Sequence, residues 1–260
     1  MKMKTSKWMM AVCVPVVLLT QSCVVRENVL EGNGPRVTVA RHLKGFERIA
    51  VKGSPTVWYT QADSFSVRVE GPEDIVDNIL TEVEDKTLTV RNRGKMGIVN
   101  FSLGGRSEKL VVHVTSPDLV GVEVSGSGDF RSERRVDTDR MQIQLRGSGD
   151  IDFRDIICDR CEVSLIGSGD VEVDRLESRS TDVSLVGSGD VDLKQWRVDD
   201  TQLALKGSGD ISVNFVEGCQ RVKCQLAGSG DISLNGSVRQ IDQTKSGSGS
   251  IKTGKLRVAE

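Results

Sequence analysis

The stretch SLVGSGDVDLKQ, residues 184–195, places Gly187, Ser188, Gly189 and Asp190 between two short segments in which apolar and polar residues alternate. Alternation with a period of two predicts β-strands that turn one face inward. The motif is repeated along half of the chain, and the spacing of 19 to 21 residues indicates a repeat architecture. Gly-Ser-Gly begins at Gly126, Gly147, Gly167, Gly187, Gly207, Gly228 and Gly247.

Apolar residues occupy the same columns in successive repeats. The first column, just after the motif, contains Phe130, Ile151, Val171, Val191, Ile211, Ile232 and Ile251. The second, two residues later, contains Phe153, Val173, Leu193, Val213 and Leu234. Before the motif come the pairs Ile143/Leu145, Val163/Leu165, Val183/Leu185, Leu203/Leu205 and Cys224/Leu226. A third apolar position is assigned to Ile156 or Ile157, Leu176, Trp196, Val216 and Val238.

Repeats of this length predict an all-β parallel solenoid. About twenty residues are too few for a strand, a helix and their loops, and hairpins would place turns at both ends of the strands. A coil of three short strands satisfies the pattern, with successive coils stacked about 4.8 Å apart. The last motif, residues 247–250, is degenerate and is followed by polar residues, which suits a terminal coil with an open edge.

The upstream part, residues 36–124, also alternates like strands but lacks the motif. It is interpreted as irregular early coils of the same solenoid, with a sheet capping its N-terminal end as the alternative. Residues 72–80 begin with proline, carry acidic residues in the first turn and space apolar residues by three to four, which predicts one short helix. Residues 91–109, rich in glycine, predict a loop or an irregular hairpin.

The N-terminus predicts export. Basic residues precede an apolar run from Trp8 to Leu19 that is too short for a permanent membrane span. Directly after it, LTQSC (residues 19–23) resembles a bacterial lipoprotein signal, although Thr20 replaces the usual aliphatic residue. We therefore expect a signal peptide at 1–22, lipidation of Cys23 and a tether at 23–35. Ordinary secretion and an uncleaved anchor are the alternatives.

The expected mature protein is one β-solenoid domain, residues 36–260, with an irregular part at 36–124 and the Gly-Ser-Gly-Asp repeats at 125–260. Its expected partner is a membrane, reached through the lipid on Cys23. Its expected location is the cell envelope, anchored in the outer membrane on the periplasmic or the cell-surface side.

Two segments carry a family resemblance. GFERIAVKGSPTVWYTQ (45–61) and SVRVEGPEDIVDNILTEVEDKTLTV (66–90), followed by serial GSGDI and GSGDV motifs, resemble the putative auto-transporter adhesin family with a head GIN domain (DUF2807). That family occurs in exported proteins of Bacteroidetes, and the resemblance extends from about Arg36 to the C-terminus. It implies a right-handed β-helix behind a lipoprotein or secretion signal, and a role in adhesion. It implies no catalytic residues.

The motif itself does not predict a phosphate site. A phosphate cradle needs a glycine-rich loop that leads into a helix, whereas each Gly-Ser-Gly here leads into a strand and is followed by a residue that is acidic in six of the seven repeats. The net charge of −2 likewise gives no field that would recruit nucleic acid. No cofactor is expected.

Stacked coils would align the acidic residues in a ladder. In water, neighbouring carboxylates about 4 Å apart repel by about 1 kcal/mol. Hydrogen bonds from serine and glycine N–H groups would offset that repulsion, and weak cation binding between coils is the alternative. Asp152, Glu172 and Asp192 extend the same outward face. The ladder contains Asp129, Asp150, Asp170, Asp190, Asp210 and Asp231.

Four cysteines follow the predicted lipidation site: Cys158, Cys161, Cys219 and Cys224. An all-thiolate zinc site, local disulfides and small buried thiols are the three possibilities. Cys224 falls in a column otherwise filled by valine and leucine, which favours packing. No metal site is therefore predicted.

The expected function is non-catalytic binding or surface structure, with a glycan or a surface protein as ligand. Nearly identical coils without insertions offer no single cleft for catalysis. Trp58 and Tyr59 are adjacent in a strand, so one faces inward and the other outward. Packing in the core is the default role for these side chains, and stacking of the outward one on a sugar is the alternative. A glycan-active β-helical enzyme and an envelope scaffold component without a soluble ligand are the alternatives.

Overall fold

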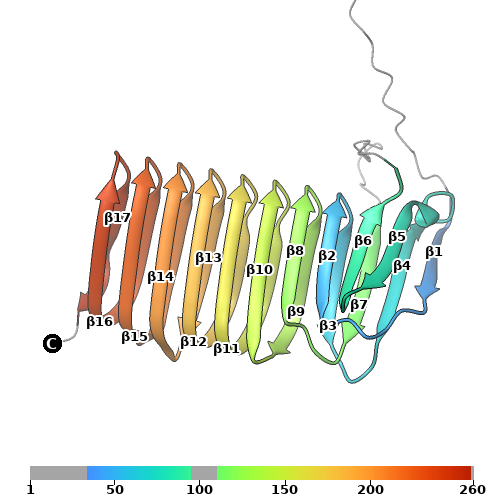
Figure 1. The fold of residues 1–260 in the computed structure, drawn as a ribbon, viewed down its shortest axis with the longest axis horizontal. Coiled ribbons are helices and arrows are strands. Elements are labelled where there is room, and N and C mark those ends of the chain that lie inside the picture. Colours follow the sequence, from blue (N-terminus) through green and yellow to red (C-terminus); the bar gives the residue numbers. More distant parts are fainter. Residues whose placement is uncertain (1–33, 95–109, 259–260) are drawn as a thin grey trace, which may run out of the picture.

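The computed structural model describes residues 34–94 and 110–258. Their strands form one sheet that winds into a parallel β-solenoid, with the coils side by side along one axis (Figure 1). The predicted signal peptide, Cys23 and most of the tether lie outside the described residues, as does most of the loop predicted at 91–109. Within the described ranges, no helix is long and apolar enough to cross a membrane.

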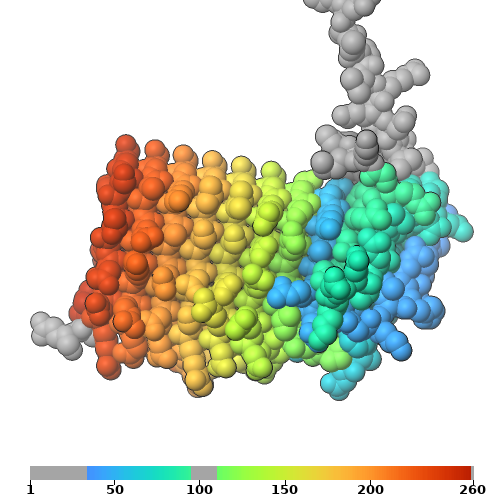
Figure 2. All heavy atoms as spheres, in the orientation of Figure 1, coloured from blue at the N-terminus to red at the C-terminus, as the bar shows by residue number. Residues whose placement is uncertain are grey.

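The repeat half forms regular coils. Successive strands pair in parallel from coil to coil, and the longer ones, such as the seventeen-residue β11, bend around a side of the solenoid. The Gly-Ser-Gly corners make up the upper edge in Figure 1 and a regular row of tips in Figure 2. The strands are β8 (Gly121–Gly126), β9 (Asp129–Asp137), β10 (Arg140–Gly147), β11 (Ile151–Gly167), β12 (Val171–Gly187), β13 (Asp190–Trp196), β14 (Val198–Gly207), β15 (Asp210–Gly228), β16 (Asp231–Ser246) and β17 (Ser250–Val258).

The predicted apolar columns beside the motif are confirmed by the strand register. Ile151 pairs with Phe130 on one side and with Val171 on the other, and the same column continues to Ile251. Cys224 pairs with Leu203, as its column predicts. Since identical positions lie directly above one another, each coil covers the apolar side chains of the previous one. One hydrophobic core therefore runs from Phe46 to Val238.

The third column differs from the prediction. Gln195, fully buried, pairs with Leu176 and Phe215, whereas Trp196 points outward beneath the guanidinium of Arg175, 4.8 Å from its ring centroid. The register shifts after Val173 because β13 reaches the same position with one residue fewer. Columns assigned at a fixed spacing from the motif do not detect that β13 is one residue shorter. The assignments of Val216 and Val238 were also wrong, because the first is exposed and the second pairs with Cys219.

The first coil of the chain is inserted between two later ones. It comprises β2 (Arg48–Gly53) and β3 (Thr56–Gln61). β2 pairs in parallel with both β6 (Thr87–Asn92) and β8, and β3 pairs with both β7 (Val111–Ser116) and β9. The turn between β2 and β3 adds an earlier corner to the row, since the N–H of Ser127 donates to the carbonyl of Gly53 at 2.9 Å.

Antiparallel strands cover the N-terminal end. β4 (Ser66–Pro72) pairs with β7, β1 (Arg36–Arg41) with β4, and β5 (Ile79–Glu84) with β6. This part thus combines coils of the solenoid with an antiparallel cover. The short helix predicted at 72–80 is instead one 3₁₀ turn, Val76–Asn78. β4 ends at Pro72 and β5 begins at Ile79, so the chain between them has room for a single turn.

Candidate functional site

The Gly-Ser-Gly-Asp corners are built from backbone contacts between coils. Gly187 has a φ of +142°, a conformation that favours glycine. A Cβ on Gly189 would collide with the carbonyl oxygen of Gly169. The N–H groups of Ser188 and Gly189 both donate to the carbonyl of Gly167, at 2.9 and 3.2 Å. The corner is therefore a stacked turn whose N–H groups are already used by the neighbouring coil.

The aspartates form a ladder along this row. From Asp150 to Asp231, each carboxylate accepts a hydrogen bond from the backbone N–H one coil further on. The donor is an aspartate N–H except at Asp231, where it is the expected serine N–H, that of Ser250. The distances are 3.4 Å for Asp150 to Asp170, 3.0 Å for Asp170 to Asp190, 3.0 Å for Asp190 to Asp210, 2.8 Å for Asp210 to Asp231 and 2.8 Å for Asp231 to Ser250.

Polar groups close both ends of the ladder. At the first coil, the Thr56 hydroxyl lies 3.5 Å from the Asp129 carboxylate. At the last coil, Lys252 Nζ lies 2.6 Å from Asp231 Oδ2. Lys252, together with the N–H of Ser250, lowers the pKa of Asp231. In the described part of the chain, no three His, Cys, Asp or Glu side chains are grouped closely enough to hold a metal ion.

A second outward row runs two residues along from the ladder. Asp152, Glu172 and Asp192 lie in register within it, and Arg131 pairs with Asp152 at 3.2 Å. Burial raises the pKa of Asp152, against the lowering effect of Arg131. Arg131 is in register with Trp58 of the inserted coil, so the outward row ends at an aromatic residue.

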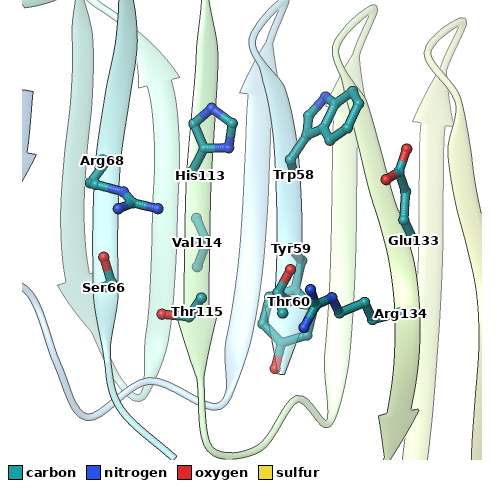
Figure 3. Close-up of a pocket in the computed structure, with 10 residues that line it drawn as sticks. All are labelled: Trp58, Tyr59, Thr60, Ser66, Arg68, His113, Val114, Thr115, Glu133 and Arg134. Atoms are coloured by element: carbon teal, nitrogen blue, oxygen red, sulfur yellow. The ribbon is translucent and has the colours of Figure 1, made fainter. Parts of the chain in front are cut away.

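A hollow of about 140 Å³ lies beside Trp58 (Figure 3). Trp58 faces outward and is half-buried, whereas Tyr59 faces inward and is 2% exposed. Burial raises the pKa of Tyr59 to about 12, and its hydroxyl lies 3.0 Å from Ser116 Oγ. The hollow is lined by Trp58, Tyr59, Thr60, Ser66, Arg68, His113, Val114, Thr115, Glu133 and Arg134.

Charged side chains surround this hollow. His113, the register partner of Trp58, lies 3.0 Å from Glu70 through Nε2, and Arg36 pairs with the same carboxylate at 3.0 Å. Arg36, followed by His113, lowers the pKa of Glu70, so an ionised carboxylate fixes the imidazole. Arg68 and Arg134 extend toward the hollow from opposite sides (Figure 3).

A second depression, of about 220 Å³, lies over β12, β14 and β15. Ser184 and Ala204 are among its small side chains, and Asp182, Gln202 and Lys223 contribute polar groups. None of its lining residues is aromatic or carries a guanidinium group. Of the two hollows, the one beside Trp58 has the wider range of groups for binding a ligand.

All four cysteines of the repeats are free, buried thiols. Burial raises the pKa of Cys224 to about 12. Cys158, hydrogen-bonded to Cys161, raises the pKa of the Cys161 thiol, and burial adds to the effect. These groups pack in the core and take no part in either hollow.

Comparison with known proteins identifies the family. The model described as "Putative auto-transporter adhesin, head GIN domain" (DUF2807) matches residues 45–219 and 183–260. The chain belongs to this family. The predicted resemblance is therefore confirmed, and the region that contains Trp58 lies inside the match.

Solved structures of similar fold come from Bacteroides and Parabacteroides species. A putative adhesin from Bacteroides fragilis NCTC 9343 is 26% identical, with a TM-score of 0.74 over 86% of this chain and 99% of the other. A putative adhesin from Parabacteroides merdae ATCC 43184 is 18% identical (TM-score 0.67, 89% and 99% covered). A putative lipid binding protein from Parabacteroides distasonis ATCC 8503 is 22% identical (TM-score 0.62, 89% and 99% covered). The last two show the fold alone. No curated protein matches the chain.

The grouping around Trp58 in this adhesin-family chain could not be found from sequence. The adjacent aromatic residues predicted that one of Trp58 and Tyr59 faces outward without indicating which, and nothing in the pattern indicated Arg68, His113 or Arg134. These three come from β4, β7 and β9, which the inserted coil brings together with β3. A pairing across such sequence separations leaves no periodic signal.

Proposed function

We propose that the protein is a non-catalytic binding protein of the bacterial cell envelope, anchored by a lipid on Cys23, with a glycan or a surface protein as ligand. Membership of a family described as putative adhesins supports this role. β1 lies at one end of the solenoid (Figure 1), so the lipid would be attached through residues 23–35 at that end. The repeats would then extend away from the anchored end.

One observation carries the binding role: the hollow beside Trp58 continues into a row of outward side chains. Asp152, Glu172 and Asp192 follow Arg131 at one residue per coil, and coils stack about 4.8 Å apart. The space-filling view shows the coils as parallel ridges (Figure 2). A regular polar row that starts at an aromatic residue suits an elongated ligand such as a polysaccharide.

The composition of the hollow favours binding over glycoside hydrolysis. Most glycosidases use two carboxyl groups on either side of the scissile bond, about 5 to 9.5 Å apart. Glu133 is the one carboxylate among the ten residues that line this hollow. Glu70, which lies behind His113, is already paired with Arg36. These groups can orient a sugar without the paired acid and base.

The test is a binding screen of the full-length lipoprotein, purified in detergent, against arrays of glycans and extracellular matrix proteins. It is run once with calcium and once with a chelator, with heat-unfolded protein as the control. Saturable binding to at least one ligand class, without change in that ligand, is the expected result. Absence of binding throughout, or reproducible cleavage of a polysaccharide, would overturn the proposal.

A further inference from the structure

We propose that the hollow beside Trp58 is a subsite for one acidic pyranose unit, of the uronic acid class, within a longer glycan. This inference rests on the proposed binding function and names the ligand chemistry of the same site. The indole of Trp58 would stack on the C–H face of the sugar ring. The guanidinium group of Arg68 or Arg134 would pair with its carboxylate.

The charges around the hollow favour an anionic ligand. Arg68 and Arg134 form no ion pair within residues 34–94 and 110–258, and both side chains are exposed. Glu133 offsets one of these two charges. Glu70 is neutralised by Arg36, and Arg131 is occupied by Asp152. One positive charge therefore remains unbalanced beside the indole.

A carboxylate matches the geometry of these groups. Guanidinium binds carboxylate through two parallel hydrogen bonds, which makes arginine suited to planar anions. Arg68 and Arg134 extend toward the hollow from opposite sides (Figure 3), so a carboxylate at either side of the bound sugar would have a guanidinium group beside it. An aromatic ring and two guanidinium groups in one hollow are a combination that neutral sugars do not require.

The remaining groups suit the hydroxyls of a sugar. His113 Nε2 faces the Glu70 carboxylate, which can only accept, so Nε2 donates to it and Nδ1 is left to hydrogen-bond a hydroxyl of the sugar. Ser66, Thr60 and Thr115 add hydroxyl groups around the floor. Hydrogen bonds from fixed side chains would select the orientation of the ring.

The size of the hollow limits the site to one unit. Pockets that enclose whole drug-sized ligands measure about 300 to 1,000 Å³, whereas this one measures about 140 Å³. A single acidic ring would occupy it, and the rest of the chain would lie on the outer face of the solenoid, where Asp152, Glu172 and Asp192 favour neutral units over further acidic ones. We therefore expect weak affinity for a monosaccharide and higher affinity for an oligosaccharide.

The experiment is calorimetric titration of the full-length lipoprotein in detergent with an otherwise neutral oligosaccharide that carries one uronic acid unit, and with its methyl ester, which keeps the ring and removes the charge. Trp58→Ala and the double variant Arg68→Gln/Arg134→Gln are compared with Lys223→Gln, which removes one positive charge at the second depression. Thermal unfolding verifies that each variant is folded. A sulfated, carboxylate-free oligosaccharide forms a further arm.

The expected result is binding of the acid at least tenfold tighter than of the ester. Trp58→Ala should weaken binding of the acid at least tenfold, the double variant should abolish the preference for the acid, and Lys223→Gln should change neither. Equal binding of acid and ester, unchanged binding in Trp58→Ala, or tighter Trp58-dependent binding of the sulfated sugar would overturn the inference. If the protein binds other ligands in the screen, those outcomes leave the proposed function intact.

Discussion

The backbone N–H of Asp210 donates a hydrogen bond of 3.0 Å to the carboxylate of Asp190, one coil before it. The same relationship joins Asp170 to Asp190 and Asp210 to Asp231. Each side chain thus satisfies a donor of the next coil, and this attraction offsets the repulsion between neighbouring carboxylates. The hydrogen bond needs only an oxygen acceptor on the side chain, so the negative charge of the aspartate is not required for it.

Two replacements of Asp190 separate its role as a hydrogen-bond acceptor from the effect of its negative charge. Asp190→Asn keeps an oxygen acceptor for Asp210 and removes a charge, so the free energy of unfolding should stay unchanged or rise. Asp190→Ala leaves the N–H of Asp210 without its side-chain acceptor and should lower the free energy of unfolding by about 0.5 to 1.5 kcal/mol. Urea denaturation measures both. Equal destabilisation by the two variants would show that the hydrogen bond does not hold the corner.

The corner glycines should tolerate no side chain. Gly189→Ala would push a methyl group into the backbone carbonyl of Gly169, and we expect a loss of about 1 to 3 kcal/mol in unfolding free energy. Gly254→Ala is the control, because its Cβ would meet nothing within 4 Å. Thermal and urea unfolding report the difference. Similar stability of the two variants would contradict the close stacking of the corners.

The side-chain amide of Gln195 is buried in the core without a full set of hydrogen bonds, which is unfavourable for stability. Its Oε1 accepts from the Thr201 hydroxyl at 2.9 Å, while its Nε2 has no partner among the described residues. Gln195→Leu with Thr201→Val removes both polar groups and should raise the unfolding free energy by about 1 to 3 kcal/mol. Thr201→Val alone should lower it, since the whole amide is then unpaired. A double variant less stable than wild type would refute this account.

Glu70 should make stability depend on acid pH. Its pKa in the folded protein is lowered by Arg36 and then by His113. The contribution is therefore fully present above the ordinary pKa of 4.5 and is lost as the pH falls below it through the lowered value. The difference in melting temperature between wild type and Glu70→Gln should shrink below pH 4.5. A difference constant from pH 7 to pH 3 would argue against the ion pair.

Lipidation at Cys23 predicts a change in location. Cys23→Ala should move the protein from the membrane fraction to the soluble fraction of cells, because the acyl chains are lost. Immunoblots of fractionated cells measure this, with Cys224→Ala as a control that removes a thiol elsewhere. Unchanged membrane association of Cys23→Ala would reject the anchor.

The repeat half could be predicted because each coil repeats the same pattern of apolar positions around the Gly-Ser-Gly motif. Positions such as Ile151 and Val171 are fixed by their distance from the motif, and parallel stacking keeps that distance in register. A fixed spacing does not predict positions where one coil is a residue shorter, as at Gln195 and Trp196. Periodicity also does not predict pairing between strands that are far apart in sequence, as for residues 48–61, which pair with strands later in the chain. The hollow beside Trp58 depends on that insertion and so was beyond a periodic pattern.

The inserted coil also makes the solenoid extensible at one end only. Residues 48–61 are held on both sides by later segments, so this region cannot gain or lose a coil without rebuilding its pairings. Beyond β9 each coil contacts only its neighbours, and gain or loss of about twenty residues would change the length of the protein by about 4.8 Å. Duplication or deletion within the repeats can therefore alter how far the molecule reaches from the anchor proposed at Cys23, while the surface around Trp58 keeps its composition.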